Sequence, residues 1–193
     1  MMRRLLFEPL PWVALLLLVA SSASAQEPVK ADRLFEAVKA NNISAVKDAL
    51  EAGAEVNARN KVHETPLIYA ARYSSTPEIV ALLLDNGADI NARKNDGGTP
   101  LISAAGISST PEIISLLLAK GAEVNARSNG GSTPLMFAAE NSSTPEIVSL
   151  LLDKGADALA KDKAGKKAID YAKKNEDLQG SEAYKKLRDR SFE

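Results

Sequence analysis

The residues that could carry catalysis or hold a metal are few in this sequence of 193 residues. It contains no cysteine, and His63 is its only histidine. A thiolate nucleophile, a cysteine-ligated metal and a cluster of histidine ligands are therefore excluded. We expect no metal and no other cofactor.

Serines, glycines and carboxylates remain as candidates for chemistry. No serine lies in the Gly-x-Ser-x-Gly turn that exposes a nucleophile. The pairs Gly97-Gly98 and Gly130-Gly131 lack the Gly-Lys-Ser/Thr that completes a phosphate-binding loop. Glu78, Glu112 and Glu146 each precede an apolar run, where a carboxylate stabilises a helix N-terminus. These observations favour structural roles and indicate that the chain is not an enzyme.

The elements that must position any site recur with a single spacing of 34 residues, which indicates an array of repeats. The recurring patterns are Thr-Pro-Leu at Thr65, Thr99 and Thr133; Gly-Ala at Gly53, Gly87, Gly121 and Gly155; Asn-Ala-Arg at Asn57, Asn91 and Asn125; and Ser-Thr-Pro-Glu at Ser75, Ser109 and Ser143.

Each repeat predicts two helices and a turn. Thr65 is expected to cap a first helix, with proline at the first helical position. The second helix begins either with Thr76 as its cap or with a capping box between Ser75 and Glu78. Its apolar residues, 79–84, predict packing on more than one side. Gly87 is expected to end it in a left-handed conformation.

The segment TPLIYAARYSSTPEIVALLLDNGADINAR resembles the ankyrin repeat, which combines a TPLH-containing helix, a VVKLLL-type helix, GADVNA and a β-turn finger. The resemblance covers nearly all of residues 26–193. It implies an all-α repeat solenoid of about five units with degenerate terminal units. The expected units are 31–63, 64–97, 98–131, 132–165 and 166–193. His63 replaces the finger glycine of the family, so we expect positive φ there.

The resemblance also implies binding of a partner protein on a concave face made of finger tips and exposed positions of the first helices. By register, the candidate contact residues are Lys61, Val62, Glu64, Asn95, Asp96 and Asn129 in the fingers, and Arg72, Tyr73, Ile107, Glu140 and Asn141 on the helices. These positions vary between repeats, whereas the core positions do not. Tyr69 and Phe137 are interpreted as core packing, with a partly exposed aromatic edge of this face as the alternative.

Charge says less about the partner. The formal net charge of −1 gives no general attraction to nucleic acid, so none is expected as a partner. A basic ladder of Arg59, Arg93, Arg127 and Lys161 indicates an acidic partner surface, an anionic glycan or a merely solvated set of charges. We expect a monomer that binds a protein.

The N-terminal segment predicts export. Arg3 and Arg4 precede an apolar run from Val13 to Ala20, and Ala23-Ser24-Ala25 is typical of a cleavage site. The run is shorter than the roughly 20 residues that span a bilayer, so we expect no stable membrane anchor. Residues 1–25 are therefore expected to be a signal peptide of a periplasmic or secreted protein. Its role is open between scaffold or stabiliser and inhibitor or immunity-type protein. The alternative is a ligand-binding protein for a cell-wall fragment or sugar.

Overall fold

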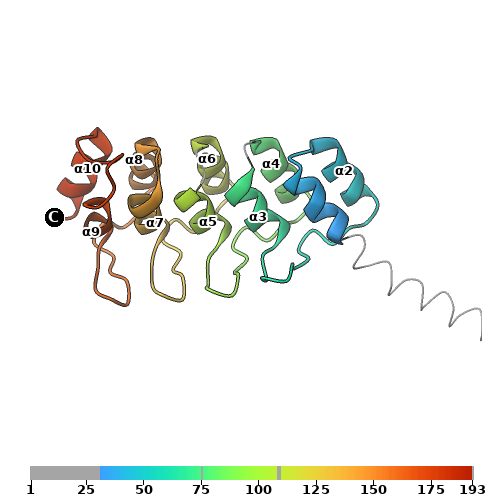
Figure 1. Cartoon of the computed structure of the whole chain (residues 1–193), viewed down its shortest axis with the longest axis horizontal. Coiled ribbons are helices and arrows are strands. Elements are labelled where there is room, and N and C mark those ends of the chain that lie inside the picture. The colour runs from blue at the N-terminus through green and yellow to red at the C-terminus, as the bar shows by residue number, and fades with distance from the viewer. Residues whose placement is uncertain (1–30, 75, 108–109, 193) are drawn as a thin grey trace, which may run out of the picture.

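The protein is a single row of helix pairs (Figure 1). The computed structural model describes residues 31–74, 76–107 and 110–192, so the predicted signal peptide lies outside the described residues. A helix covers residues 31–39. It is followed by α2 Ile43–Glu51, α3 Pro66–Tyr73, α4 Pro77–Asp85, α5 Pro100–Ile107, α6 Pro111–Ala119, α7 Pro134–Asn141, α8 Pro145–Asp153, α9 Ala168–Ala172 and α10 Glu182–Arg190.

These ranges contain no strand, which confirms the predicted all-α repeat solenoid. None of their helices is long and apolar enough to cross a membrane.

The first helix of each central repeat begins as predicted. Thr65 Oγ1 accepts a hydrogen bond of 3.3 Å from the backbone N–H of Ile68, and Pro66 is the first helical residue. Thr99 and Thr133 make the same bond, each at 3.3 Å. The threonine satisfies a backbone donor that the helix leaves free, and the proline has no such donor to satisfy.

The second helix begins with Thr76 at the cap position and Pro77 as its first residue, as one of the two alternatives has it, although the Thr76 side chain makes no capping bond. Ser74 Oγ instead accepts a 3.0 Å bond from the Thr76 N–H, while Ser75 lies outside the described residues. At the far end, Gly87 has φ +85°, and the Ala88 N–H bonds back to the carbonyl of Leu83 at 3.0 Å. This is the predicted left-handed helix end.

Small residues allow the first helices to approach one another. The alanine pairs 70–71, 104–105 and 138–139 are fully buried, and the first helices of neighbouring repeats pack more closely than the second helices do. We call the side of the row that carries the first helices and the turns beyond them its inner side. Leu117 of α6 is 0% exposed, as expected for a sandwiched second helix.

Candidate functional site

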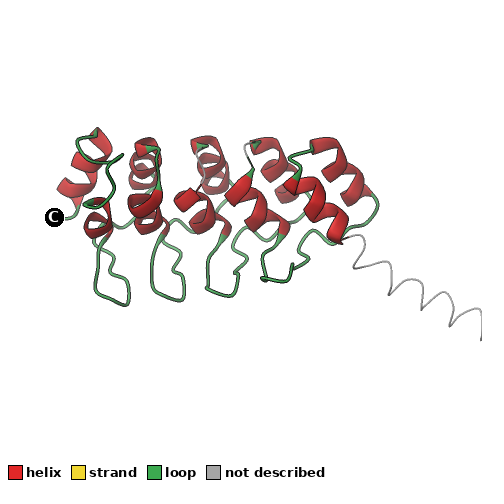
Figure 2. Ribbon diagram, in the orientation of Figure 1, coloured by secondary structure: helices red, strands yellow, loops and turns green. Residues whose placement is uncertain are grey.

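Four five-residue turns project from the row beyond the first helices; we call them the fingers (Figure 2). They comprise residues 60–64, 94–98, 128–132 and 162–166. In each, the N–H of the first residue bonds at 3.0 Å to the carbonyl of the last. His63 has φ +62° in the first finger, where the others have glycine, so the predicted positive φ is confirmed.

Asparagine side chains fasten each repeat to the next one. Asn57 Nδ2 donates to the carbonyl of Gly87 at 3.1 Å, and its Oδ1 accepts from the Asp89 N–H at 2.8 Å. Asn125 bonds to Gly155 and Asp157 in the same way, and Asn91 Oδ1 accepts from Glu123. The asparagine of the Asn-Ala-Arg pattern is thus a contact between repeats.

The basic ladder fastens the chain beside the fingers. Arg59 Nη1 donates to the carbonyl of Arg93 at 2.8 Å, Arg93 Nη2 to that of Arg127 at 2.8 Å, and Arg127 Nη1 to that of Lys161 at 2.7 Å. The three arginines therefore have a structural role that neither interpretation of the ladder included. Leu159 and Lys161 replace the asparagine and the arginine in the last finger's repeat, beyond which the described residues contain no further finger.

The fingers also contact one another directly. The Asn129 N–H donates to the carbonyl of Asp96 at 2.7 Å, and the Lys163 N–H to that of Gly130 at 3.0 Å. A Cβ atom at Gly97 would lie 2.4 Å from Asn129 Oδ1, so the close approach of these fingers requires glycine there. The fingers form a connected edge along the inner side of the row.

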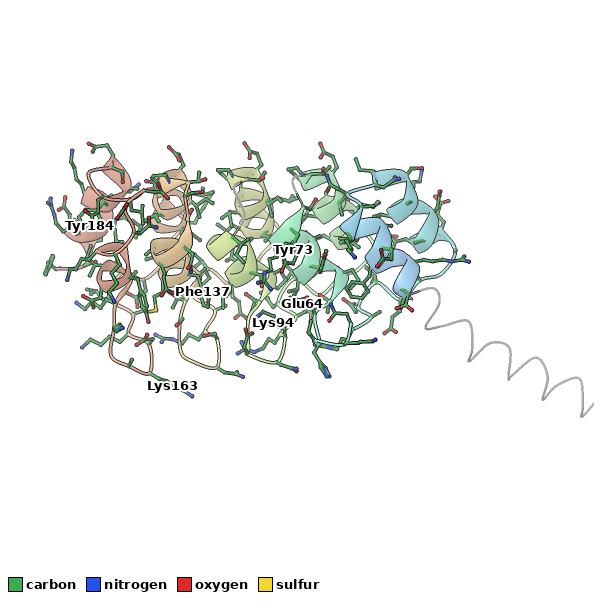
Figure 3. All side chains as sticks on the ribbon, in the orientation of Figure 1. Glu64, Tyr73, Lys94, Phe137, Lys163 and Tyr184 are labelled. Atoms are coloured by element: carbon green, nitrogen blue, oxygen red, sulfur yellow. The ribbon has the colours of Figure 1, made fainter. Side chains whose placement is uncertain are left out.

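Nine of the eleven candidate contact residues are exposed: Lys61, Val62, Tyr73, Asn95, Asp96, Ile107, Asn129, Glu140 and Asn141. Arg72 is half-buried and Glu64 is buried. Figure 3 shows Glu64, Tyr73, Lys94 and Phe137 on one side of the row, over the first helices and the base of the fingers.

The expectation that Glu64 is an exposed finger contact is wrong. Only 5% of this residue is exposed. Its Oε1 lies 3.3 Å from Arg72 Nη1, and its Oε2 accepts a 3.2 Å bond from Asn60 Nδ2. The Arg72 guanidinium lies 4.8 Å from the centroid of the Tyr73 ring, within the range of a cation–π contact. Glu64 therefore holds Arg72 in place, and Arg72 in turn contacts Tyr73. Glu64 is too buried to be a contact residue for a partner.

The second finger carries a further ion pair at its base. Lys94 Nζ bonds to Asp96 Oδ2, and Asp96 Oδ1 accepts a 2.8 Å bond from the Gly98 N–H. Partial burial raises the pKa of Asp96, but the bonds from Lys94 and Gly98 outweigh it, so the pKa lies below its ordinary value. A Cβ atom at Gly98 would lie 2.8 Å from Lys94 Cε, so this glycine makes room for the lysine side chain.

A pocket of about 340 Å³ opens on the inner side beside this ion pair. Its walls are mainly Ile102, Ser103, Gly106, Ile107, Phe137 and Asn141, with Arg72, Lys94, Asp96, Gly98 and Ser128 completing the lining. We name it the Ser103 pocket. Gly106 is buried in its wall, and Phe137 is half-buried, which agrees with the alternative of a partly exposed aromatic edge. Sequence reasoning missed the pocket, although the small residues Gly98, Ser103 and Gly106 in one repeat were a signal.

Within the described ranges, no three histidine, aspartate or glutamate side chains come close enough together to hold a metal ion. Beside the last finger, a hydrogen bond to Asp162 raises the pKa of Tyr171 to about 12. That bond ties α9 to the finger. The face can therefore offer shape, exposed apolar side chains and hydrogen bonds.

Comparison with known proteins agrees with this geometry. A family model described as ankyrin repeats (3 copies) matches residues 34–128 and 105–189. No curated protein matches the chain. The two matched ranges include all four fingers and the helix pairs of the three central repeats. The chain belongs to the ankyrin-repeat family.

Proposed function

We propose that this protein is an exported interaction module that binds a partner protein through the inner face formed by its fingers and first helices. Ankyrin repeats generally mediate protein–protein interaction and are typically not enzymes. The observation that carries the choice of face is its exposed apolar side chains. Val62 is 59% exposed, Tyr73 54% and Ile107 53%. Large apolar side chains exposed on one face of a protein are typical of an interaction surface.

The opposite face supports the same choice by contrast. Helices α4, α6 and α8 contribute none of the exposed large hydrophobic residues in the described part of the chain, and α2 contributes Ile43, which is 43% exposed. The apolar residues of α4, α6 and α8 are used between repeats: Leu83, Leu117 and Leu151 are fully buried. A partner would find little apolar contact area on the second helices of the central repeats.

Preorganisation is a second advantage of the inner face. The arginine and asparagine contacts fix each finger relative to the next, and two finger pairs are joined through their backbones. A surface that is already ordered loses less conformational entropy on binding. Exposed Lys61, Lys163 and Lys166 add positive charge near the fingers, which favours a partner with an acidic surface.

The compartment and the role belong to the proposal as well. The basic start, apolar run and Ala23-Ser24-Ala25 support export with cleavage near Ala25, to a periplasm or the cell exterior. A monomeric module of this kind fits a scaffold or stabiliser of a periplasmic enzyme, or an inhibitor or immunity-type protein. Enzyme activity of the captured partner, measured with and without this protein, separates the two roles.

Site-specific photocrosslinking tests the face. A photoreactive phenylalanine analogue is placed at Ile107, or at Ser115 on the outer side of α6 as a matched control, since both residues are exposed. Crosslinking in intact cells followed by mass spectrometry is expected to give one protein adduct from position 107 and none from position 115. An adduct from position 115 alone would show that the outer face binds the partner.

A further inference from the structure

One repeat lacks an aromatic ring at a position where the other repeats have one. Phe35, Tyr69, Phe137 and Tyr171 occupy equivalent positions of their first helices, and Ser103 occupies that position in α5. All four rings are half-buried. The rings of Phe35 and Tyr69 lie 6.4 Å apart at 87°, an edge-to-face contact. We call this series of ring positions along the first helices the aromatic column. It is interrupted at Ser103.

The Ser103 pocket lies at this interruption. Its repeat also has glycine at two positions where other repeats carry side chains: Gly98 is equivalent to Glu64, and Gly106 to Arg72. Both glycines line the pocket together with Ser103. A Cβ atom at Gly106 would lie 3.4 Å from Phe137 Cδ1, so a side chain there would grow into the space in front of that ring. Three small residues in one repeat thus create a hollow bordered by Phe137.

The hydroxyl of Ser103 indicates what kind of group belongs in the pocket. Among the described residues, it is the one buried side-chain polar atom without a hydrogen-bond partner. A buried polar group without a partner is unfavourable, and native proteins rarely keep one. Neighbouring atoms cover this oxygen, so it meets an occupant of the pocket only after rotation about χ1 to another staggered position, where a serine hydroxyl serves as donor or acceptor. An occupant that has a hydrogen-bonding group near Ser103 would satisfy it.

We propose that the Ser103 pocket receives a tyrosine side chain of the partner protein, with its ring between Ile107 and Phe137 and its hydroxyl bonded to Ser103. The inference rests on the proposed function and specifies the chemistry of the partner. A ring restores the aromatic column, and the phenol supplies the bond that Ser103 lacks. A volume of about 340 Å³ accommodates one large side chain.

The surroundings favour a protein segment over a free small molecule. Ile107 at the pocket and Tyr73 on the neighbouring first helix are each more than half exposed. A free ligand inside the pocket would leave the Tyr73 ring uncovered, whereas a polypeptide that inserts one tyrosine would extend over it. Interface anchors are typically aromatic side chains that fill such pockets and are surrounded by weaker contacts.

The test uses N-acetyl-L-tyrosinamide and N-acetyl-L-phenylalaninamide as probes, titrated into the isotope-labelled protein and followed by NMR. Both are expected to shift the amide signals of Ser103, Gly106 and Ile107, with tyrosinamide binding roughly three- to tenfold more tightly, the worth of one net hydrogen bond. Ser103→Ala is expected to abolish that preference. Gly106→Leu is expected to weaken both probes at least tenfold by filling the pocket, and Ser115→Ala to change neither.

Several outcomes would overturn the inference. Equal affinity of the two probes for the unmodified protein would remove the role of the hydroxyl, as would a preference that survives Ser103→Ala. The alanine variant decides the matter even if Gly106→Leu does not fold. If N-acetylglucosamine shifts these amides and tyrosinamide does not, the pocket belongs to a sugar.

The crosslinking experiment distinguishes failure of this inference from failure of the proposed function. If position 107 crosslinks to a protein and neither Ser103→Ala nor Gly106→Leu lowers the yield, the inner face binds the partner but this inference is wrong. If no protein crosslinks from position 107 while tyrosinamide binds, the proposed function fails and the inference fails with it.

Discussion

Replacing Leu117 by alanine tests whether the second helices are sandwiched between repeats. Leu117 is 0% exposed in the middle of α6, between α4 and α8. The change removes three carbons, and at about 0.8 kcal/mol per buried methylene the lost burial alone amounts to about 2.4 kcal/mol. The cavity raises the expected loss of unfolding free energy to roughly 2–5 kcal/mol. Helices α4 and α8 are held by their own repeats and cannot move far enough to fill it.

Two variants serve as controls in urea melts followed by circular dichroism at 222 nm. Leu116→Ala makes the same chemical change at a half-buried position and is expected to cost clearly less. Asp48→Ala changes an exposed residue of the first repeat and is expected to stay within about 0.5 kcal/mol. If Leu117→Ala and Leu116→Ala destabilise equally, the burial pattern assigned to α6 is wrong.

Three further predictions address the start of the chain, one hydrogen bond and the ladder. N-terminal sequencing of protein from cell fractions is expected to find a mature chain beginning at Gln26; full-length chain in the cytoplasm would contradict this. The hydrogen bond to Asp162 raises the pKa of Tyr171 to about 12. The stability that this bond contributes is therefore complete below about pH 10 and is lost as the pH rises through 12. The difference in unfolding free energy between the unmodified protein and Tyr171→Phe should shrink over that range in denaturant melts. Arg93→Ala removes the bond to the carbonyl of Arg127, just before the next finger, and should cost about 1 kcal/mol in the same melts, whereas Lys161→Ala, at the last position of the ladder, should cost less than half of that.

The predictions from sequence succeeded where one stretch of chain determines the structure. Thr65 and Pro66 start a helix by local geometry, and Gly87 ends one because its backbone conformation requires positive φ. The fold class followed, because these signals recur with one period. Burial of Glu64 could not be predicted in this way. It depends on where the side chain of Arg72 lies, eight residues along the chain on α3.

The burial of Glu64 changes how the inner face should be probed by mutation. Arg72→Ala would leave the buried Glu64 carboxylate without its cation, an unfavourable state that lowers stability as well as affinity. A variant intended to affect binding alone should therefore change Tyr73 and Ile107 and keep the ion pair. Tyr73→Ala with Ile107→Ala is expected to weaken partner binding by about 2 kcal/mol or more.

The contacts between repeats explain why the residues of the inner face can vary. Arg59, Arg93 and Arg127 each reach forward to the carbonyl of the next repeat, and the asparagines of the same pattern do likewise. These side chains fix the spacing of the fingers, so the exposed positions of the first helices are not needed for contacts between repeats. Arginine, glycine and glutamate can follow one another at positions 72, 106 and 140 while the backbone repeats. Position 103 varies for the same reason. The contacts between neighbouring repeats keep the row intact, so serine can replace the aromatic ring there and leave a pocket open.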